Sequence, residues 1–394
     1  MKIALLQGGG TCPGSNAAHL GLTETALRDG HEVVVIPEGY RGLITPNQDY
    51  RNILEYPFVR EYGLHSLFLE PGALPCTSRT KPLPVDDEGN LVQADMNVFH
   101  GNAAAIQENL TQNRIDILAL VGGDDTLWRG ASKLHQYEVL QRRGLHGRYQ
   151  TVQAVGVPKT IDNDFYGISY SFGATTAALR GQAFVDEMRR AEAQNCQKVV
   201  VIETMGRESG WLPAASAELA DGVLIPEVEL SEDDVVRAMQ EKVRTMGKAL
   251  VLVVAEGHTI KGKMIHLAGP PDAFGHMRLG GVRFIIEQWL NNAKINTMQL
   301  CPGYLFRSSP PTLRDAHFAR RLGQTAMEAA LAGKDGVIAH LPESSRSLED
   351  PLALMDMAAI RGGKKLDPAA YDAATLRYTK PLMPEPERPS WIDP

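Results

Sequence analysis

Short runs of aliphatic residues alternate with longer amphipathic segments along most of the chain, and this alternation limits the folds open to it. Several runs consist almost entirely of Val, Ile and Leu, which is typical of strands that are covered on both faces. The predicted strands are 2–7, 31–36, 115–121, 152–157, 198–203, 222–225, 249–255 and 336–340, and the predicted helices are 15–28, 102–113, 127–142, 173–194, 209–220, 233–247, 281–291 and 312–332. Such alternation indicates βαβ units with mostly parallel strands, and the number of units predicts more than one sheet.

Two regions do not fit this alternation. Residues 41–100 are rich in Pro, Asn, Asp and Gly, which predicts a long surface excursion or a β-rich insertion. The segment after Pro342 has weak periodicity and ends in MPEPERPSWIDP. Its proline density favours an extended segment laid on the surface.

Composition excludes several classes of protein. The 394 residues include 40 Lys and Arg against 47 Asp and Glu, so the net charge of −7 lacks the basic footprint of a nucleic-acid binder. The longest apolar stretch, 249–255, is far shorter than the roughly 18 residues that span a bilayer. The amino terminus, MKIALLQGGG, is too short in its apolar run for a signal peptide. The cysteines form no C-x-x-C pair, which favours a reducing cytoplasm over a disulfide scaffold or a metal site; they are Cys12, Cys76, Cys196 and Cys301. We therefore expect a cytoplasmic protein with no nucleic-acid or membrane partner, whose anionic ligands are held by local cations.

The first predicted strand runs directly into the glycine-rich segment GGGTCPG at residues 8–14, and a predicted helix follows. Glycines allow backbone N–H groups to approach an anion, and a helix start adds partial positive charge. The spacing matches neither a Walker loop nor the dinucleotide-binding pattern. A tight strand-to-helix turn explains the segment equally well.

A second polar segment, Gly122-Gly123-Asp124-Asp125-Thr126, also follows a predicted strand. Ligands of open α/β sheets bind at this end of the strands. Carboxylates beside glycines can hold phosphates together with Mg²⁺, which prefers oxygen ligands that it shares with phosphate. A helix N-cap is the simpler alternative, but two adjacent aspartates after two glycines favour a site.

The third segment, PKTIDND at residues 158–164, is the most informative. Asp162 is placed to take the proton from an attacking hydroxyl, as a carboxylate does in kinase catalytic loops. Thr160 offers a hydroxyl, and Lys159 offers a point charge for phosphate. A turn rich in Asn and Asp accounts for part of this string but not for all of it.

Taken together, these segments resemble the phosphofructokinase family. The resemblance continues through Met205-Gly206-Arg207 with Gly210, through Glu256-Gly257 and through PGYLFR at 302–307, so it spans roughly residues 1–340 in order. It implies an α/β protein of two Rossmann-like αβα domains with mostly parallel sheets, an active site in the cleft between them, and a homo-oligomer such as a dimer or tetramer. The implied domains are 1–173 plus 306–356 for the donor and 174–305 plus 357–394 for the sugar phosphate.

The resemblance also implies a role for each matching residue. Asp162 would be the base that deprotonates the sugar 1-hydroxyl, with Arg207 and Thr160 as further catalytic residues. Asp124 would bind the Mg²⁺ that bridges the donor phosphates, with Asp164 assisting nearby. The donor-binding residues would be Gly9, Gly10, Tyr40, Arg79, Gly123, Asp125 and Lys159. The substrate-binding residues would be Asp164, Lys198, Met205, Gly206, Glu256, Tyr304 and Arg307.

The phosphoryl donor follows from two positions. ATP-dependent members of the family typically read GGDG and PGTIDND, whereas this chain has Asp125 and Lys159 there, the pattern of the pyrophosphate-dependent branch. Asp125 puts bulk and negative charge where the α-phosphate of ATP needs a bare glycine, and Lys159 suits a compact, highly charged donor. We expect Mg²⁺-dependent, reversible transfer from pyrophosphate to fructose 6-phosphate, giving fructose 1,6-bisphosphate and phosphate in glycolysis or gluconeogenesis.

Departures from the family pattern cluster on the acceptor end. A family arginine that reaches a neighbouring subunit's sugar phosphate is here Lys198, another usual cation is Met298, and the usual Gly-Gly-Ser-Pro is the segment 308–311. Lysine lacks the bidentate fork of arginine. A different ketose phosphate, such as sedoheptulose 7-phosphate, therefore stays open as acceptor, as does an ATP-dependent 6-phosphofructokinase. Two alternative hypotheses fit the sequence less well. NAD and lipid kinases share GGD but lack PKTIDND. A non-catalytic phosphosugar-binding module would not need Asp162.

Overall fold

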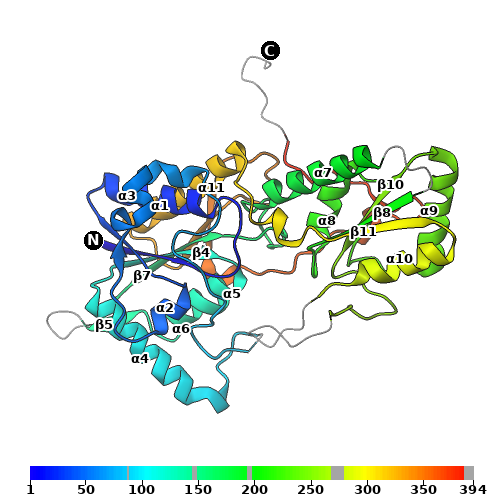
Figure 1. Ribbon diagram of the computed structural model, residues 1–394. Coiled ribbons are helices and arrows are strands. Elements are labelled where there is room, and N and C mark those ends of the chain that lie inside the picture. Colours follow the sequence, from blue (N-terminus) through cyan, green and yellow to red (C-terminus); the bar gives the residue numbers. More distant parts are fainter. Residues whose placement is uncertain (87, 144–148, 193–197, 268–278, 386–394) are drawn as a thin grey trace.

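The computed structural model describes residues 1–86, 88–143, 149–192, 198–267 and 279–385. Two lobes lie side by side, each with its own mainly parallel sheet (Figure 1). The larger sheet has seven strands in the order β13-β12-β7-β4-β1-β2-β3, and the smaller has four in the order β11-β8-β10-β9. The predicted α/β class with mostly parallel sheets is confirmed.

The larger sheet is parallel in its centre and antiparallel at both edges. Its strands are β1 (Lys2–Gln7), β2 (Glu32–Val35), β3 (Arg51–Asn52), β4 (Ile117–Gly122), β7 (Gln153–Pro158), β12 (Val337–His340) and β13 (Ala353–Asp356). Only the outermost pairs, β2 with β3 and β12 with β13, are antiparallel. Successive side chains of β1 pack into hydrophobic cores on opposite faces of the sheet. Ile3 and Leu5 belong to one core, and Leu6 belongs to the other. The Val, Ile and Leu runs therefore mark strands with two buried faces, as predicted.

Helices cover both faces of this sheet (Figure 1). On one face α1 (Ser15–Arg28) packs against α11 (Leu313–Leu331). The two helices approach so closely that a Cβ on Gly21 would lie 2.0 Å from the carbonyl oxygen of Arg320. The other face carries α4 (Met96–Gln112), α2 (Tyr40–Ile44) and α6 (Lys133–Gln136).

The smaller sheet is entirely parallel. It contains β8 (Lys198–Thr204), β9 (Gly222–Leu224), β10 (Leu250–Ala255) and β11 (Asn296–Leu300). One face packs on α7 (Ala174–Ala191) and α8 (Trp211–Ser216), the other on α9 (Glu232–Met246) and α10 (Val282–Asn292). The strand β11 was not predicted because Asn296, Thr297 and Gln299 are polar and interrupt any apolar run.

Two further expectations are wrong in detail. The predicted helix 127–142 is replaced by a π-helical turn (Leu127–Ser132), α6 and the start of the strand β5 (Gln141–Arg143), which pairs with β6 (Tyr149–Thr151). The short helix α5 (Asp124–Thr126) precedes the π-helical turn. The described residues of 41–100 form no β-rich insertion: they hold α3 (Pro57–Tyr62) and the 3₁₀ turns Ile53–Glu55, Leu64–Phe68 and Gln93–Asp95. Ile53 and Leu67 are fully buried, so part of this excursion belongs to the core.

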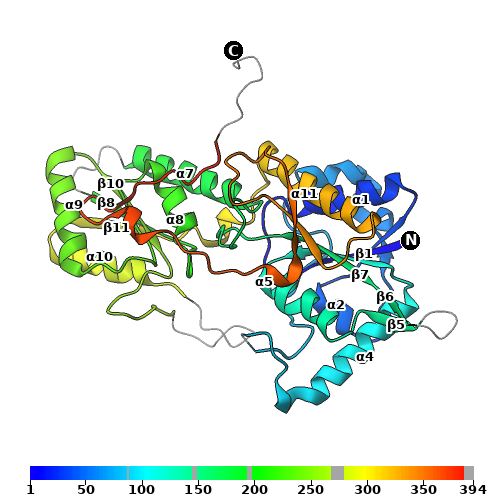
Figure 2. The same cartoon turned by 180° about the vertical axis from the view of Figure 1, so that it is seen from behind.

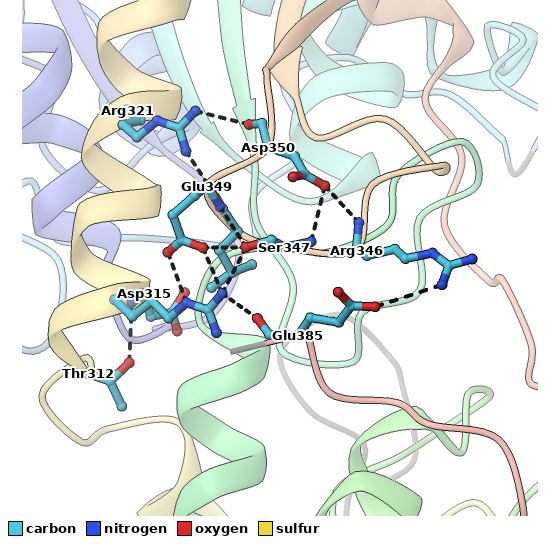
Figure 3. A network of polar contacts seen from close by, with 10 residues as sticks. Thr312, Asp315, Arg321, Arg346, Ser347, Glu349, Asp350 and Glu385 are labelled. Carbon is cyan, nitrogen blue, oxygen red and sulfur yellow. Dashed lines mark hydrogen bonds and ion pairs between the residues drawn. The ribbon is translucent and has the colours of Figure 1, made fainter. Parts of the chain in front are cut away.

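The described part of the segment after β12 packs against both lobes, whereas most of the proline-rich end, for which an extended surface segment was predicted, lies outside the described residues. It runs from beside α5 in the larger lobe across to the smaller lobe (Figure 2). There the hairpin β14 (Tyr371–Asp372) and β15 (Arg377–Tyr378) places Leu376 in the core, and the hydroxyl of Tyr371 donates to the carbonyl of Val223 at 2.6 Å. Its described end returns to the segment after β12, where the amide of Glu385 donates to the carbonyl of Arg346 at 2.8 Å. The carboxylate of Glu385 also pairs with the guanidinium of Arg346 at 3.8 Å (Figure 3). Alternating polarity gave no sign of this packing.

The predicted domain boundaries remain a prediction. β12 and β13 lie in the larger sheet, and Leu376 lies in the core of the smaller lobe. No helix in the described ranges is long and apolar enough to cross a membrane.

Replacing Leu376 with alanine tests the packing of the carboxyl-terminal segment. This side chain has 0% exposure, so Leu376→Ala removes buried contacts and should lower the free energy of unfolding by about 2–4 kcal/mol. Leu354→Ala, on a side chain with 41% exposure, is the control and should cost less than about 1 kcal/mol. Urea unfolding followed by fluorescence measures both, and equal losses would contradict the assigned packing.

Candidate active site

The ends of three neighbouring strands bring the polar segments together. Gln7 pairs with Val121 and Val121 with Val157, so β1, β4 and β7 end at one level of the sheet. The amide of Lys159 donates to the carbonyl of Gly122 at 2.9 Å, which extends the ladder into the segments that follow the strands. The glycine-rich segment, GGDD and PKTIDND therefore share one edge, as expected for ligand-binding α/β sheets.

A cavity of about 250 Å³ opens at this edge. Its lining contains many of the predicted site residues, namely Gly9, Gly10, Tyr40, Arg79, Gly123, Asp124, Asp125, Lys159, Thr160, Asp162, Arg207 and Arg307. It also contains residues to which no role was assigned: Cys12, Thr126 and Ile161 lie within the three polar segments, and Ser78, Thr80 and Lys81 lie beside Arg79. Ser78, Thr80 and Lys81 adjoin Arg79 in the chain, and that proximity was the only available signal.

The glycine-rich segment contacts its surroundings through both N–H groups and carbonyl groups. The amides of Gly8 and Gly9 donate to the carbonyls of Val121 and Ser78, both at 3.0 Å, so these two N–H groups are already used. The carbonyl of Gly10 accepts from the Lys159 ammonium at 2.6 Å, and that of Thr11 accepts from Nε of Arg307 at 3.0 Å. An anion here would therefore be held mainly by the side-chain cations that the loop positions.

Gly10 must remain without a side chain for this arrangement to form. A Cβ at Gly10 would lie 2.3 Å from Nη2 of Arg307, far inside a normal contact. The glycine therefore allows the guanidinium to lie directly against the loop.

Lys159 is a buried cation. The residue has only 5% exposure, and burial lowers the pKa of its ammonium to about 8, with repulsion from Arg307 and Arg79 in the same direction. The pKa still lies above neutral pH, so the ammonium keeps its charge there. A desolvated charge of this kind interacts with a phosphate much more strongly than an exposed lysine does.

Asp162 has the properties of a general base. Burial, reinforced by the neighbouring Asp164, raises the pKa of its carboxyl to about 7, against the opposing effect of Arg307 and Lys159. Its Oδ1 atom is buried and has no hydrogen-bond partner among the described residues. A carboxylate with a pKa near neutrality is well matched to accepting and releasing a proton.

A short hydrogen-bond chain fixes the turn that carries Asp162. The amide of Asp162 donates to Oγ1 of Thr160 at 3.1 Å, and that hydroxyl donates to Oδ1 of Asp164 at 2.9 Å. The buried Asn163 completes the turn by accepting from the amide of Ser171 at 2.8 Å. Thr160 thus connects the Asp164 carboxylate with the main chain of Asp162.

Asp124 is the strongest candidate for contact with a metal ion. Burial and the nearby Asp125 and Asp164 raise the pKa of its carboxyl, and a bound cation would relieve this repulsion. Within the described ranges, no three His, Cys, Asp or Glu side chains are grouped so as to hold an ion alone. That donor set suits Mg²⁺, which is commonly bound by one or two carboxylates together with substrate phosphates and water.

The negative charge of the Asp125 carboxylate is partly balanced by a cation that the sequence did not predict to lie beside it. Its Oδ1 accepts from Nη1 of Arg129 at 2.8 Å, in an i,i+4 ion pair on the turn that follows β4. Its bulk remains in the cavity lining, while part of its charge is balanced.

The second lobe supplies the opposite wall. Thr204 pairs with Ala255, so the segments after β8 and β10 lie together, and the amide of Gly257 donates to the carbonyl of Gly206 at 3.0 Å. Burial raises the pKa of Glu256 to about 7, reinforced by Asp162 and opposed by Arg207. The acceptor-side glutamate is therefore close enough to the Asp162 carboxylate for their charges to interact.

Tyr40 lines the cavity, but its hydroxyl donates to the carbonyl of Thr126 at 2.6 Å. Other predicted residues lie outside the lining. The side chain of Tyr304 has 67% exposure, and its ring centroid lies 5.6 Å from the Arg307 guanidinium. Lys198 begins β8, at the opposite end of that strand from the cavity, and pairs with Glu192 at 2.9 Å. Also outside the lining are Asp164, Met205, Gly206 and Glu256, which follow the strands nearby. The role of each of these residues remains a prediction.

Comparison with known proteins establishes the family. The phosphofructokinase family model matches residues 2–330. Two relatives named pyrophosphate–fructose 6-phosphate 1-phosphotransferase are those of Thermoproteus tenax, 32% identical over 86% of this chain and 88% of its own, and Dictyoglomus thermophilum, 31% identical over 96% and 99%. This chain belongs to the phosphofructokinase family, and the prediction of a phosphotransferase enzyme of that family is confirmed.

Two further proteins are similar to this chain. A relative from Mycobacterium bovis named ATP-dependent 6-phosphofructokinase is 30% identical over 85% of this chain and 89% of its own. The crystal structure of a pyrophosphate-dependent phosphofructokinase from Nitrosospira multiformis has a TM-score of 0.77, 18% identity, and coverage of 100% of this chain and 94% of its own. The structural match supports the fold, and the phosphoryl donor depends on the residues of the site.

The raised pKa of Asp162 predicts a pH-dependent effect on stability. Because the folded-state pKa exceeds the ordinary value, the wild-type protein loses stability as pH rises from about 4 to about 7. Asp162→Asn removes this penalty and should stabilise the protein by about 2–4 kcal/mol at pH 8 but little at pH 4. Asp234→Asn is the control of opposite sign, because that carboxyl has a lowered pKa. Denaturant unfolding at both pH values measures the difference, and an equal effect at pH 4 and pH 8 would contradict the assignment.

Proposed function

We propose that this protein transfers a phosphoryl group from pyrophosphate to the 1-hydroxyl of fructose 6-phosphate, producing fructose 1,6-bisphosphate and phosphate. The observation that carries the proposal is the buried Lys159 ammonium, held against Gly10 in the cavity that Asp124 also lines. ATP-dependent members of the family typically have glycine at this position. The names of the relatives from Thermoproteus tenax and Dictyoglomus thermophilum support the same donor and acceptor.

The chemistry follows from charge and position. Asp162, once ionised, accepts the proton of the 1-hydroxyl as that oxygen attacks phosphorus. Lys159, Arg79 and Arg307 balance the charge of the phosphates, while Arg207 approaches from the second lobe. Mg²⁺, when bound at Asp124, would neutralise the donor phosphates further. Catalysis therefore depends on positioning and electrostatic stabilisation, which dominate in phosphoryl transfer.

The cavity favours a small donor. Its volume of about 250 Å³ is below the roughly 300–1,000 Å³ of pockets for drug-sized ligands. Because Arg129 balances part of the charge of Asp125, the bulk of Asp125 opposes a nucleotide more than its charge does. The positive charge that Lys159 retains attracts the densely charged pyrophosphate. Transfer breaks the phosphoanhydride bond of pyrophosphate, releases phosphate and forms a phosphate ester on the sugar. Because no nucleoside triphosphate is consumed, we propose a nearly balanced reaction that runs in either direction, in glycolysis or gluconeogenesis.

The remaining parts of the proposal concern the acceptor and the assembly. Lys198 is paired with Glu192 at the far end of β8, away from the cavity. We also propose a cytoplasmic homo-oligomer in which Lys198 reaches the sugar phosphate bound by a neighbouring copy of the chain, as the family resemblance implies. The acceptor is proposed as fructose 6-phosphate, with sedoheptulose 7-phosphate as the alternative that Lys198 and Met298 leave open.

Assays of every donor with every acceptor test the proposal directly. With Mg²⁺ and fructose 6-phosphate, kcat/KM for pyrophosphate should exceed that for ATP by at least about 100-fold, which corresponds to roughly 3 kcal/mol of discrimination. Asp125→Gly should raise activity with ATP, because it removes the bulk that opposes the nucleotide. Asp29→Gly, at an exposed site outside the cavity, is the control. Faster turnover of the wild-type protein with ATP would overturn the proposed donor, and preference for sedoheptulose 7-phosphate would overturn the proposed acceptor.

The proton-transfer role predicts both a mutational and a pH effect. Asp162→Ala should lower kcat by about 10³-fold or more while the Kd for fructose 6-phosphate, measured by calorimetry, stays within about threefold. In the wild-type protein, kcat/KM should rise as Asp162 ionises near pH 7 and fall as Lys159 loses its proton near pH 8. Substantial turnover by Asp162→Ala would assign the base to another residue.

A further inference from the structure

A short part of the carboxyl-terminal segment lies against the active-site carboxylates. This part, Arg361-Gly362-Gly363-Lys364, is called the RGGK segment below. It lies beyond residues 2–330, the range that matches the family model. In Figure 2 the orange part of the chain passes beside α5 before it crosses to the smaller lobe.

The RGGK segment binds the TIDND turn through its backbone. The amide of Gly363 donates to Oδ2 of Asp164 at 3.2 Å, and the amide of Lys364 donates to the carbonyl of Asp164 at 2.7 Å. In return, the amide of Tyr166 donates to the carbonyl of Arg361 at 3.0 Å, and its hydroxyl donates to the carbonyl of Gly363 at 3.2 Å. Both the side chain and the main chain of Asp164 are thereby held in place.

The same segment reaches Asp124 on its other side. A Cβ built on Gly362 would lie 3.3 Å from Cγ and from Oδ2 of Asp124, so the glycine leaves the carboxylate only just enough room. The guanidinium of Arg361 stacks 3.7 Å from the ring centroid of Trp128, four residues after Asp124. Its Nη1 also donates to the carbonyls of Ala358 and Ile360, both at 2.7 Å. Arg361 thus fixes the segment to the turn that carries Asp124.

These contacts connect the segment with the proposed base. Asp164 accepts from the Thr160 hydroxyl, which in turn accepts from the amide of Asp162. A displacement of the segment is therefore transmitted through Asp164 to the turn of Asp162, and directly to Asp124.

We propose that the RGGK segment is a positioning element for phosphoryl transfer, which holds Asp164 by backbone hydrogen bonds and limits the orientation of the Asp124 carboxylate through Gly362. This inference rests on the proposed function, because it assigns Asp124 to the donor site. The segment touches the carboxylates and not the reacting atoms, so it acts through them.

Gly362→Ala tests the proposal with the smallest possible change. The added methyl group forces the Asp124 carboxylate to move by a few tenths of an ångström. We expect the Kd for magnesium methylenediphosphonate, measured by calorimetry without turnover, to rise about fivefold to tenfold, while the Kd for fructose 6-phosphate stays within about twofold. The KM for magnesium pyrophosphate should rise in parallel.

Gly101→Ala is the matched control. Gly101 lies in α4 with nothing within 4 Å of its added Cβ, so both dissociation constants should equal those of the wild-type protein. If Gly362→Ala does not fold, Tyr166→Phe removes one contact to Gly363 from a residue with 53% exposure and should lower kcat about twofold to fivefold at unchanged melting temperature.

The outcomes separate this inference from the proposed function. A folded Gly362→Ala protein with wild-type affinity for the diphosphonate overturns the positioning role, as does an unchanged kcat in Tyr166→Phe if only that variant folds. A wild-type protein that binds a non-hydrolysable magnesium–ATP analogue but not the diphosphonate contradicts the proposed donor instead. The comparison of Gly362→Ala with Gly101→Ala is then made with that analogue, and equal affinities again overturn the role.

Discussion

The burial of opposite charges at one sheet edge is the interaction on which the site depends. Asp162 and Lys159 follow the same strand, β7, and lie in a cavity that removes much of their hydration. Burial raises the pKa of the carboxyl to about 7 and lowers that of the ammonium to about 8, so the two values approach each other. The protein bears the cost of desolvating both groups, and its fold must hold them there. The result is that a carboxylate with a pKa near neutrality, Asp162, lies three residues after a strongly interacting cation, Lys159.

The second lobe adds to this electrostatic arrangement. Glu256 follows β10 and also has a raised pKa, partly because of Asp162, while Arg207 and Arg307 counter the repulsion. Carboxylates from the two sheets thus share one arginine, Arg307. Under the proposed function, a phosphorylated sugar between the lobes would compete for this arginine, and its binding would be coupled to the protonation of both carboxylates. The parallel sheets matter because each brings its strand ends to the junction of the lobes.

The sequence predicted those parts of the fold and site that depend on local pattern. The runs of β1, β4, β7, β8 and β10 are rich in Val, Ile and Leu, and the three polar segments of the larger lobe directly follow such runs. The sequence did not predict β11, in which polar residues interrupt the apolar ones, or the π-helical turn Leu127–Ser132. The contact of Gly362 with Asp124 joins residues more than two hundred positions apart, and no local periodicity encodes it. Even the ion pair of Asp125 with Arg129, which is local, was overlooked because both fit an ordinary helical surface.

That ion pair changes the physical basis of donor selection. An i,i+4 pair at a partly exposed site contributes little to stability, about 0.3–0.5 kcal/mol, yet it places a positive charge beside Asp125. The repulsion between Asp125 and a nucleotide is correspondingly weaker, and what remains is steric. Lys159 has no comparable carboxylate ion pair among the described residues: its ammonium donates to the neutral carbonyl of Gly10 and stays available to a phosphate. Under the proposed function, selection of pyrophosphate would therefore depend on attraction by one buried cation combined with exclusion by one side chain, and these two effects would act on different parts of the donor.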